Sequence, residues 1–329
     1  MRTCRLISLT LLMGLSLLLL SCSNADNHII SLMHANINCS DLTRSRGFYE
    51  MLGFTAVMEG DSEVTAEFAA GLNMPPYTLS FTQMLSMDGS LIDLIEWKDP
   101  YDDSVPYSSV NHLGIARLTL ETTDLDADIV TLSAQGVGFF SEPVIADRSA
   151  GNKRFVCFKD LDGTIIELVE TEAVGSFASS DIHITGIKSV TINCSNYEQS
   201  RVFYENLGFT EVVNIDENGT PETAAALGMP SYQVYGSVMR LRFGGPALNL
   251  LRWEEPYDKS GPYAQLNHLG IARIALMSTD LDADVARLKA EGVEFFSEPV
   301  MPDGPLSFMR IVCLKDPDGT VIELVELFP

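Results

Sequence analysis

The segment Asn-His-Leu-Gly-Ile-Ala-Arg occurs twice in this chain, at residues 111–117 and again at residues 267–273. The flanking sequence repeats with it. Phe48-Tyr49 corresponds to Phe203-Tyr204, and Ser141-Glu142-Pro143-Val144 corresponds to Ser297-Glu298-Pro299-Val300. The chain is therefore one domain written twice, and each copy serves as a reference for the other. A position that differs between the copies is a candidate for a difference in function.

The length of 329 residues agrees with two domains of ordinary size. Within each copy a weaker repeat starts at Ser31 and again at Gly114, so that each domain contains two modules. Each module begins with a strand of alternating polarity and continues with a helix that a glycine ends, at Gly53 and Gly136. Three further strands follow, and Asp-Gly pairs at 88–89, 162–163 and 318–319 predict tight hairpins between them. We predict an α+β fold with two domains, residues 27–173 and 183–329, joined by a linker at 174–182. In each domain the polar faces of two curved mixed sheets, one from each module, enclose a cleft.

The N-terminus has the pattern of an export signal. Arg2 and Arg5 precede the apolar run 6–20, and a small residue and Cys22 follow. Leu19-Leu20-Ser21-Cys22 resembles a bacterial lipobox, in which the cysteine receives lipid and becomes the first mature residue. We therefore expect residues 1–22 to be a lipoprotein signal, and the mature protein to be anchored in the cell envelope, at the outer membrane. An ordinary signal peptide or an uncleaved anchor remains the alternative, and both also export the chain.

Net charge restricts the partners. The chain carries a formal charge of −24, with 21 basic and 45 acidic residues. Such a surface repels phosphate backbones and anionic lipid, so nucleic acid is excluded as a partner and membrane contact falls to the lipid anchor alone. Beyond Cys22, the four cysteines are two positions duplicated with the domain, each within an apolar strand; we expect small buried side chains there.

Several motifs together resemble the vicinal oxygen chelate superfamily, which includes glyoxalases, bleomycin-resistance proteins and extradiol dioxygenases. The motifs are Phe48-Tyr49 with Leu52-Gly53-Phe54, Asp124-Leu125-Asp126-Ala127 before Gly136-Val137, and the segment from Asp316 to Leu324. The resemblance covers nearly all of the chain beyond the signal and implies the fold described above. It does not imply one reaction, because the superfamily includes isomerases, dioxygenases, epimerases, thiol transferases and proteins that only bind a drug.

In metal-dependent relatives, the cleft of a domain holds one divalent ion on the first and last strands of its two modules. Those positions correspond to His34, Asp93, Arg117 and Glu167 in the first domain and to Ser189, Asn249, Arg273 and Glu323 in the second. A guanidinium has no lone pair to donate, so Arg117 and Arg273 argue against the usual site. Each arginine is instead expected to pair with its glutamate, and the second domain is expected to hold no metal. In the first domain His34, Asp93 and Glu167 could still form a three-ligand site for one divalent metal if Arg117 turns aside, with Glu167 as the candidate catalytic group.

Other residues have two interpretations each. Trp97 and Trp253, with nearby tyrosines, either wall a cleft for an apolar ligand or cap the core. His112 and His268 are expected to make structural hydrogen bonds. Asp160-Leu161-Asp162-Gly163 begins like a calcium loop but has Thr171 at its twelfth position, so we predict a hairpin turn.

Two classes of function remain from the sequence. In one, both clefts bind a small organic molecule, with Arg117, Arg273, Glu323, Trp97 and Trp253 as ligand-binding residues and most metal ligands lost. In the alternative, the first domain is a divalent-metal-dependent lyase or dioxygenase. An extradiol dioxygenase is disfavoured because such enzymes keep their site in the C-terminal domain, here the more degraded one. A glyoxalase reaction is disfavoured because glutathione is scarce outside the cytoplasm.

Overall fold

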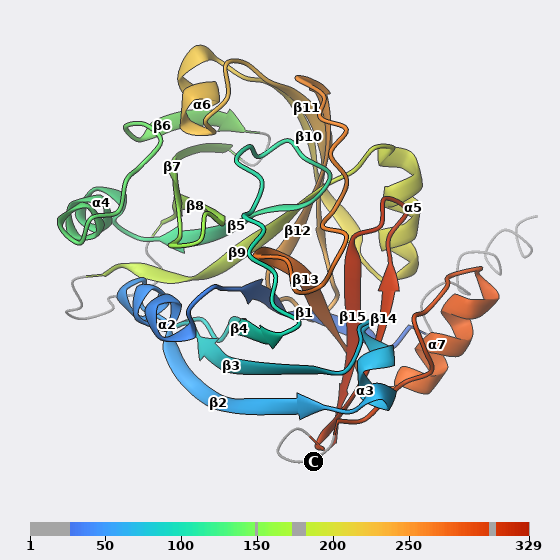
Figure 1. Ribbon diagram of the computed structural model, residues 1–329. Coiled ribbons are helices and arrows are strands. Elements are labelled where there is room, and N and C mark those ends of the chain that lie inside the picture. Colours follow the sequence, from blue (N-terminus) through green and yellow to red (C-terminus); the bar gives the residue numbers. More distant parts are fainter. Residues whose placement is uncertain (1–26, 149–150, 173–181, 303–306, 329) are drawn as a thin grey trace, which may run out of the picture.

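The structure is a computed structural model that describes residues 27–148, 151–172, 182–302 and 307–328 (Figure 1). Cys22, the signal segment and nearly all of the expected linker lie outside these residues. Within them, no helix is long and apolar enough to cross a lipid bilayer.

Four modules follow one another along the chain, as the sequence predicts. The first contains β1 (Ile29–Asn38), α2 (Leu42–Met51), β2 (Thr55–Val64), α3 (Ala66–Gly71), β3 (Tyr77–Leu85) and β4 (Leu91–Asp99). The second contains β5 (Gly114–Thr122), α4 (Leu125–Ala134), β6 (Val144–Arg148), β7 (Gly151–Lys159) and β8 (Ile165–Glu170). The third contains β9 (Ile184–Asn193), α5 (Tyr197–Asn206), β10 (Thr210–Asn218), α6 (Pro221–Ala226), β11 (Gln233–Arg240) and β12 (Ala247–Glu255). The fourth contains β13 (Gly270–Ser278), α7 (Leu281–Ala290), β14 (Met309–Lys315) and β15 (Val321–Leu327). In the described part of the fourth module, isolated bridges from Phe295 to Leu314 and from Val300 to Ile311 stand in place of the first of the three expected strands.

Local signals in the sequence place the helix ends and the turns correctly. Asp41 and Asp124 cap α2 and α4 by accepting hydrogen bonds from backbone N–H groups three residues on. After these helices the chain turns at Gly53 and Gly136, both with φ near +90°, which a residue with a Cβ adopts only at a cost. The three predicted Asp-Gly hairpins are confirmed between β3 and β4, β7 and β8, and β14 and β15. The Asp160 segment is therefore a turn.

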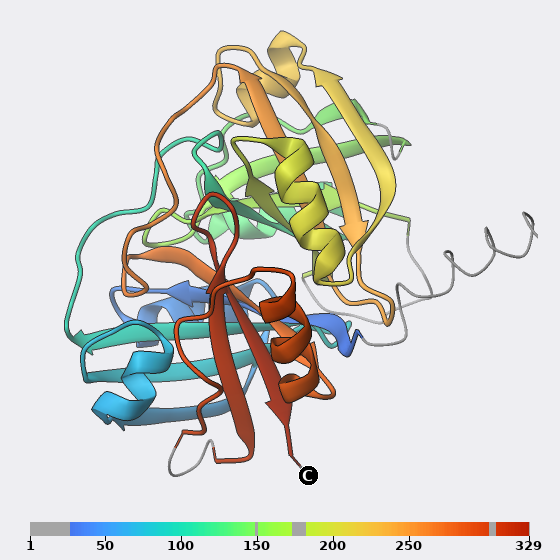
Figure 2. The same cartoon turned by 90° about the vertical axis from the view of Figure 1, so that its right-hand side faces the viewer.

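The modules pair between the two copies of the repeat. One mixed sheet has the order β14-β15-β13-β1-β4-β3-β2, and the other has the order β10-β11-β12-β9-β5-β8-β7-β6. The first sheet thus joins the first and fourth modules, through the antiparallel pair β1–β13, and the second joins the two middle modules through β5–β9. Figure 2 shows the consequence: the blue and red ends of the chain share one lobe, and the green to orange middle forms the other. The α+β class and the curved mixed sheets are confirmed, but the expectation that the two modules of one copy enclose a common cleft is wrong.

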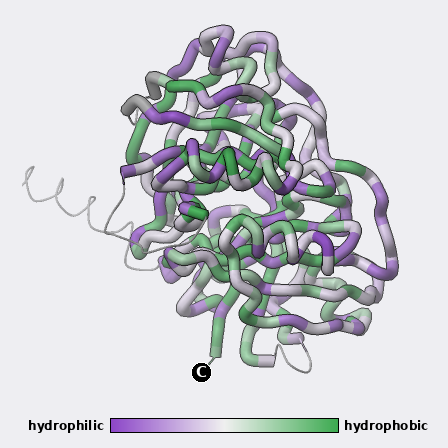
Figure 3. Tube along the Cα trace, turned by 90° about the vertical axis from the view of Figure 1, so that its left-hand side faces the viewer, coloured by the Kyte–Doolittle hydropathy of each residue, from purple (hydrophilic) through white to green (hydrophobic). Residues whose placement is uncertain are grey.

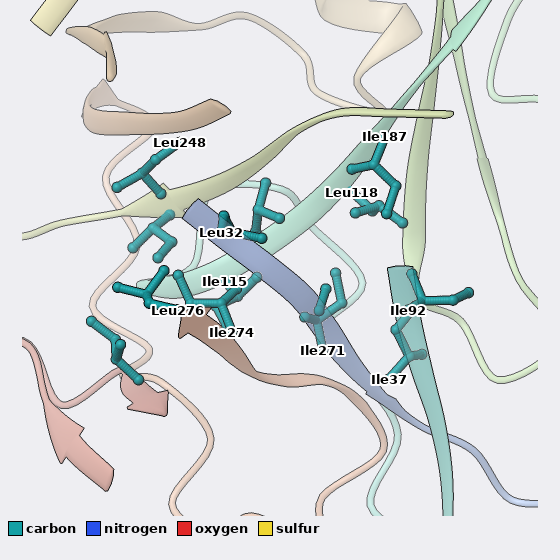
Figure 4. Packing of buried hydrophobic residues seen from close by; sticks show 14 of the residues in the cluster. Leu32, Ile37, Ile92, Ile115, Leu118, Ile187, Leu248, Ile271, Ile274 and Leu276 are labelled. Atoms are coloured by element: carbon teal, nitrogen blue, oxygen red, sulfur yellow. The ribbon is translucent and has the colours of Figure 1, made fainter. Parts of the chain in front are cut away.

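A continuous apolar core holds the two lobes together. It contains residues from all four modules, among them Ile92 of β4, Leu118 of β5, Leu248 of β12 and Ile274 of β13, and these four are fully buried (Figure 4). Along the tube of Figure 3 hydrophobic and hydrophilic stretches alternate at short intervals, as strands with one apolar and one polar face require. The apolar strand faces meet the long helices in this core. The polar strand faces line the concave side of each curved sheet, where a ligand cavity can form.

Candidate functional site

Each sheet carries a cavity on its polar face. The larger has a volume of about 760 Å³ and lies on the sheet of the first and fourth modules; we call it cleft A. Its lining includes His34 of β1, Asp93 of β4, Arg273 of β13 and Glu323 of β15. These four strands are consecutive neighbours in the sheet, and strand alternation turns the four side chains to the same face. Cleft A is therefore built from both copies of the repeat.

The polar groups of cleft A form two linked pairs. Nε of Arg273 donates to Oε2 of Glu323 at 3.1 Å, and the imidazole Nε2 of His34 lies 3.2 Å from Oδ2 of Asp93. The same imidazole nitrogen is 3.9 Å from Oε2 of Glu323, so the pairs meet at one point. Burial is the largest single effect and lowers the pKa of Arg273, but the charge and hydrogen bond of Glu323, together with Cys313 and Tyr77, outweigh it, so the pKa of the guanidinium is raised. The arginine stays charged at any ordinary pH.

Three buried nitrogen atoms of cleft A have no hydrogen-bond partner among the described residues. They are Nδ1 and Nε2 of His34 and Nη1 of Arg273, in side chains that are 7% and 8% exposed. Buried polar groups are nearly always partnered, and leaving one without a partner costs about 1–3 kcal/mol. Because Nε2 of His34 lies 3.2 Å from Asp93, the hydrogen-bonding capacity that the protein leaves unused on the floor of cleft A lies at Nδ1 of His34 and Nη1 of Arg273.

The walls of cleft A are largely apolar. Phe68 and Leu72 from the α3 region, Tyr77 and Phe81 of β3, and Val325 of β15 all line it. Helix α3 belongs to the first module but contacts β14 of the fourth, so it closes one side of the cavity across the junction between the copies. An apolar chamber over a few polar groups is the usual form of a small-molecule site.

The second cavity, cleft B, lies on the sheet of the two middle modules and has a volume of about 230 Å³. Arg117 of β5 and Glu167 of β8 pair there at 2.8 Å, with side chains that are 6% and 1% exposed. Where cleft A has His34 and Asp93, cleft B has Ser189 and Asn249, and the amide of Asn249 donates to the Ser189 hydroxyl at 2.9 Å. The two clefts therefore share an arginine–glutamate pair and differ in the other two groups.

The candidate metal ligands taken from the sequence are divided between the clefts. His34 and Asp93 line cleft A, whereas Glu167 lines cleft B with Arg117. The expected set of His34, Asp93 and Glu167 is thus wrong as a single site, because it assumed that modules of the same copy pair. The glutamate that accompanies His34 is Glu323. Nothing in the sequence indicates this exchange, since both glutamates follow the same Asp-Gly hairpin motif.

The remaining candidates are placed as follows. Trp97 is buried in an apolar cluster with Tyr77, and its indole N–H donates to Asn38; it packs in the core and is not among the residues that line cleft A. Trp253 makes the matching bond to Asn193, yet it also lines cleft B. Only Trp253 thus stands at a cleft wall.

His112 and His268 are confirmed as structural. Each imidazole Nδ1 lies within hydrogen-bond distance of the carbonyl oxygen of the next residue. The His268 ring stacks on Tyr263 at 4.0 Å between centroids. Burial lowers the pKa of His112 to about 4, so its ring stays neutral at neutral pH. The four described cysteines are buried free thiols, as predicted.

The groups in cleft A do not fit a bound divalent metal as they stand. Oε2 of Glu323 lies 3.9 Å from Nε2 of His34 and already accepts a hydrogen bond from Arg273. The guanidinium beside this oxygen would repel a cation. Among the described residues there is no group of three or more His, Cys, Asp or Glu side chains that could hold a metal ion. In cleft B, Ser189 and Asn249 supply neither an imidazole nor a carboxylate.

Sequence reasoning missed the basic side chains at the cleft rims. Lys188 of β9 and Arg240 of β11 line both clefts, and Lys153 of β7 lines cleft B. No motif surrounds these residues in the sequence, so nothing in their neighbourhood marks them as part of a site.

Comparison with known proteins defines the class. The family model of the Glyoxalase/Bleomycin resistance protein/Dioxygenase superfamily matches residues 31–168 and 186–324, and the chain belongs to this family. The Bacillus subtilis protein YwkD, described as uncharacterized, is 29% identical over 146 residues, which is 44% of this chain and 98% of that protein. It therefore corresponds in length to one copy of the repeat.

Solved structures support the arrangement of the whole chain. Glyoxalase I from Zea mays superposes with a TM-score of 0.61 at 16% identity, covering 90% of this chain and 92% of that one. A putative dioxygenase from Bacillus subtilis gives 0.59 at 14% identity, covering 92% and 87%. At such identities the likeness shows the fold alone.

Proposed function

We propose that this protein binds a small organic molecule in cleft A, as an exported, lipid-anchored member of its family in which most metal ligands have been replaced. The observation that carries the proposal is the Arg273–Glu323 pair. It occupies the floor of a cavity of about 760 Å³ where a metal would need the glutamate oxygen, and it leaves Nη1 of Arg273 without a partner.

The chemistry of the cavity indicates the kind of ligand. Three basic and four acidic side chains line cleft A, and most of them are paired with one another, as Lys188 is with Glu121 at 2.5 Å. A charged ligand would disturb this balance, and an anion would also face the carboxylates of Asp93 and Glu323. An uncharged molecule with an apolar body and a carbonyl or similar oxygen suits the site, because the oxygen can accept from Arg273 or His34.

A direct test uses N-phenyl-1-naphthylamine, an uncharged probe that becomes fluorescent in apolar surroundings. We expect about one equivalent to bind, and we expect Ser62→Trp, which places an indole in cleft A from β2, to weaken binding at least tenfold. Val213→Trp fills cleft B from the corresponding strand and is the matched control, with unchanged affinity. Equal affinity in both variants, or no saturable binding by the wild type, would refute the proposal.

The second candidate is a divalent-metal-dependent lyase or dioxygenase, and one observation favours it. Both nitrogens of His34 lack a hydrogen-bond partner while two carboxylates lie within 3.9 Å of Nε2. Metal content of protein purified without added ions separates the candidates. One equivalent of Mn, Fe, Ni or Zn that is lost in His34→Ala would favour the enzyme, whereas absence of metal after incubation with each ion would favour the binding protein.

A further inference from the structure

Cleft B has the opposite charge balance to the rest of the molecule. The chain as a whole carries −24, yet four basic side chains line cleft B against two acidic ones. The basic groups are Arg117, Lys153, Lys188 and Arg240, and the acidic groups are Glu167 and Glu217. In cleft A the acidic side chains outnumber the basic ones. A small cavity lined mainly by basic side chains focuses positive potential on a molecule that enters it, even in an acidic protein.

On the floors of the clefts, the charge difference comes from one position on equivalent strands. Asp93 pairs in register with Asn36 of β1, and Asn249 pairs in the same way with Thr191 of β9. Asn249 therefore stands where cleft A has a carboxylate. Its amide donates to Ser189 and Thr191 at 2.9 and 3.3 Å, so the neutral side chain is held firmly in place. The floor of cleft B thus has one carboxylate, Glu167, which is paired with Arg117, where the floor of cleft A has two.

The floor also has unused donors. Nη1 of Arg117 and Oγ1 of Thr119 are buried without a hydrogen-bond partner among the described residues. Both residues line cleft B and are only 5% and 2% exposed. Arg117 already neutralises Glu167 through Nε, so its remaining N–H groups are oriented by that bond and available to an acceptor.

Much of the remaining lining of the cavity is apolar. Trp253 and Leu251 of β12 and Val234 of β11 belong to this part. Such a lining cannot hydrate a phosphate or sulfate dianion, whereas it suits the body of a small organic acid. A volume of about 230 Å³ is below the usual range for drug-sized ligands and matches a molecule about as large as a single substituted ring.

We propose that cleft B is a second binding site, specific for a small apolar monocarboxylate whose carboxylate group is received by Arg117 and Thr119. It is separate from the site proposed in cleft A and takes a different class of ligand. The anion reaches the floor past Lys153, Lys188 and Arg240, and its apolar body packs against Trp253.

The test uses benzoate and its uncharged counterpart benzamide, which has nearly the same shape. Trp97 and Trp253 are the two tryptophans of the chain, so in a Trp97→Phe background the fluorescence excited at long wavelength reports on cleft B. We expect saturable quenching by benzoate, with an affinity at least tenfold above that for benzamide, and weakening as salt concentration rises. Inorganic phosphate is the second probe, and we expect it to compete only weakly.

Asn249→Asp in this background is the decisive variant, because it gives cleft B the carboxylate of cleft A. The hydroxyls of Ser189 and Thr191 can donate to the new carboxylate, so the fold should be retained, which circular dichroism and thermal unfolding would check. We expect at least a tenfold loss of benzoate affinity, while Asp93→Asn in cleft A leaves it unchanged. Equal binding of benzoate and benzamide, unchanged affinity in Asn249→Asp, or phosphate binding as tight as benzoate would each overturn the proposal.

Discussion

The Arg273–Glu323 pair allows a quantitative test of how the clefts are held together. The two side chains are 8% and 5% exposed and 3.1 Å apart, so removing either one leaves its partner buried and charged. Breaking a buried pair in this way typically costs about 3–5 kcal/mol. We expect Arg273→Met to reach that range, since the carboxylate then has no counter-charge. Glu323→Gln should cost less, because a glutamine oxygen can still accept from Nε.

The assay is urea unfolding of the two single variants and the double variant, with the coupling energy taken from the cycle. We expect the double variant to be less destabilised than the sum of the singles by about 1.5–3 kcal/mol. The same cycle at Arg117 and Glu167 should give a similar value, since that pair is equally buried at 2.8 Å. The exposed pair of Lys289 and Glu298 should show coupling near the error of measurement. Additive effects at Arg273 and Glu323 would show that the two side chains do not meet.

Three further predictions concern other parts of the chain. Labelling cells with a clickable fatty acid should mark the wild type and not Cys22→Ala, and equal labelling of both would end the lipoprotein interpretation. Residues 23–176 and 177–329, expressed as separate halves, should co-purify as a one-to-one complex, because each sheet takes strands from both; a stable monomeric half with its own cleft would contradict the pairing. Burial raises the pKa of Asp160 to about 6, although hydrogen bonds from backbone N–H groups at the turn oppose part of this rise. The native state therefore favours the protonated acid more than the unfolded state does. The stabilisation that protonated Asp160 contributes is complete below about pH 4 and is lost as the pH rises through 6. Linkage gives a decrease of about 3 kcal/mol in the free energy of unfolding over this interval. Asp160→Asn keeps the shape of the protonated acid but does not titrate. Its free energy of unfolding in urea, relative to that of the wild type, should therefore rise over this pH interval; a difference that does not change with pH would refute the raised pKa of Asp160.

Local features of this fold are predictable from sequence because their causes lie within a few residues. Asp124 caps a helix through the N–H three residues later, and Gly163 turns a hairpin with φ of +105°. The alternation around Arg117 likewise identifies its cleft-facing side, since Leu118 and Leu120 must enter the core. Each of these inferences is independent of the residues that lie far away in the sequence.

The composition of the clefts depends instead on which modules meet, and that choice is not local. The edge of β1 can pair with β5 of its own copy or with β13 of the other copy. The repeat makes these two strands alike, since both begin with Gly-Ile-Ala-Arg, at 114–117 and 270–273. Hydrophobic pattern and register are therefore satisfied equally by both pairings. In the structure β1 pairs with β13, and for this reason His34 faces Glu323 and not Glu167.

The pairing between copies gives the duplication a consequence for function. The sheet beneath each cleft combines one module from each copy, so each copy contributes to both clefts. A substitution at a position that lines only one cleft therefore changes that cleft, whereas Lys188 and Arg240 line both. The arginine–glutamate pair is the same in both clefts, with Nε bonded to Oε2 in each, which fits a common part in fixing the strands. The positions that differ are those beside the pair, with His34 and Asp93 in one cleft and Ser189 and Asn249 in the other. If the shared pair fixes the scaffold and the differing positions select the ligand, then exchanging Asp93 with Asn249 should exchange the charge preference of the clefts while the free energy of unfolding changes little.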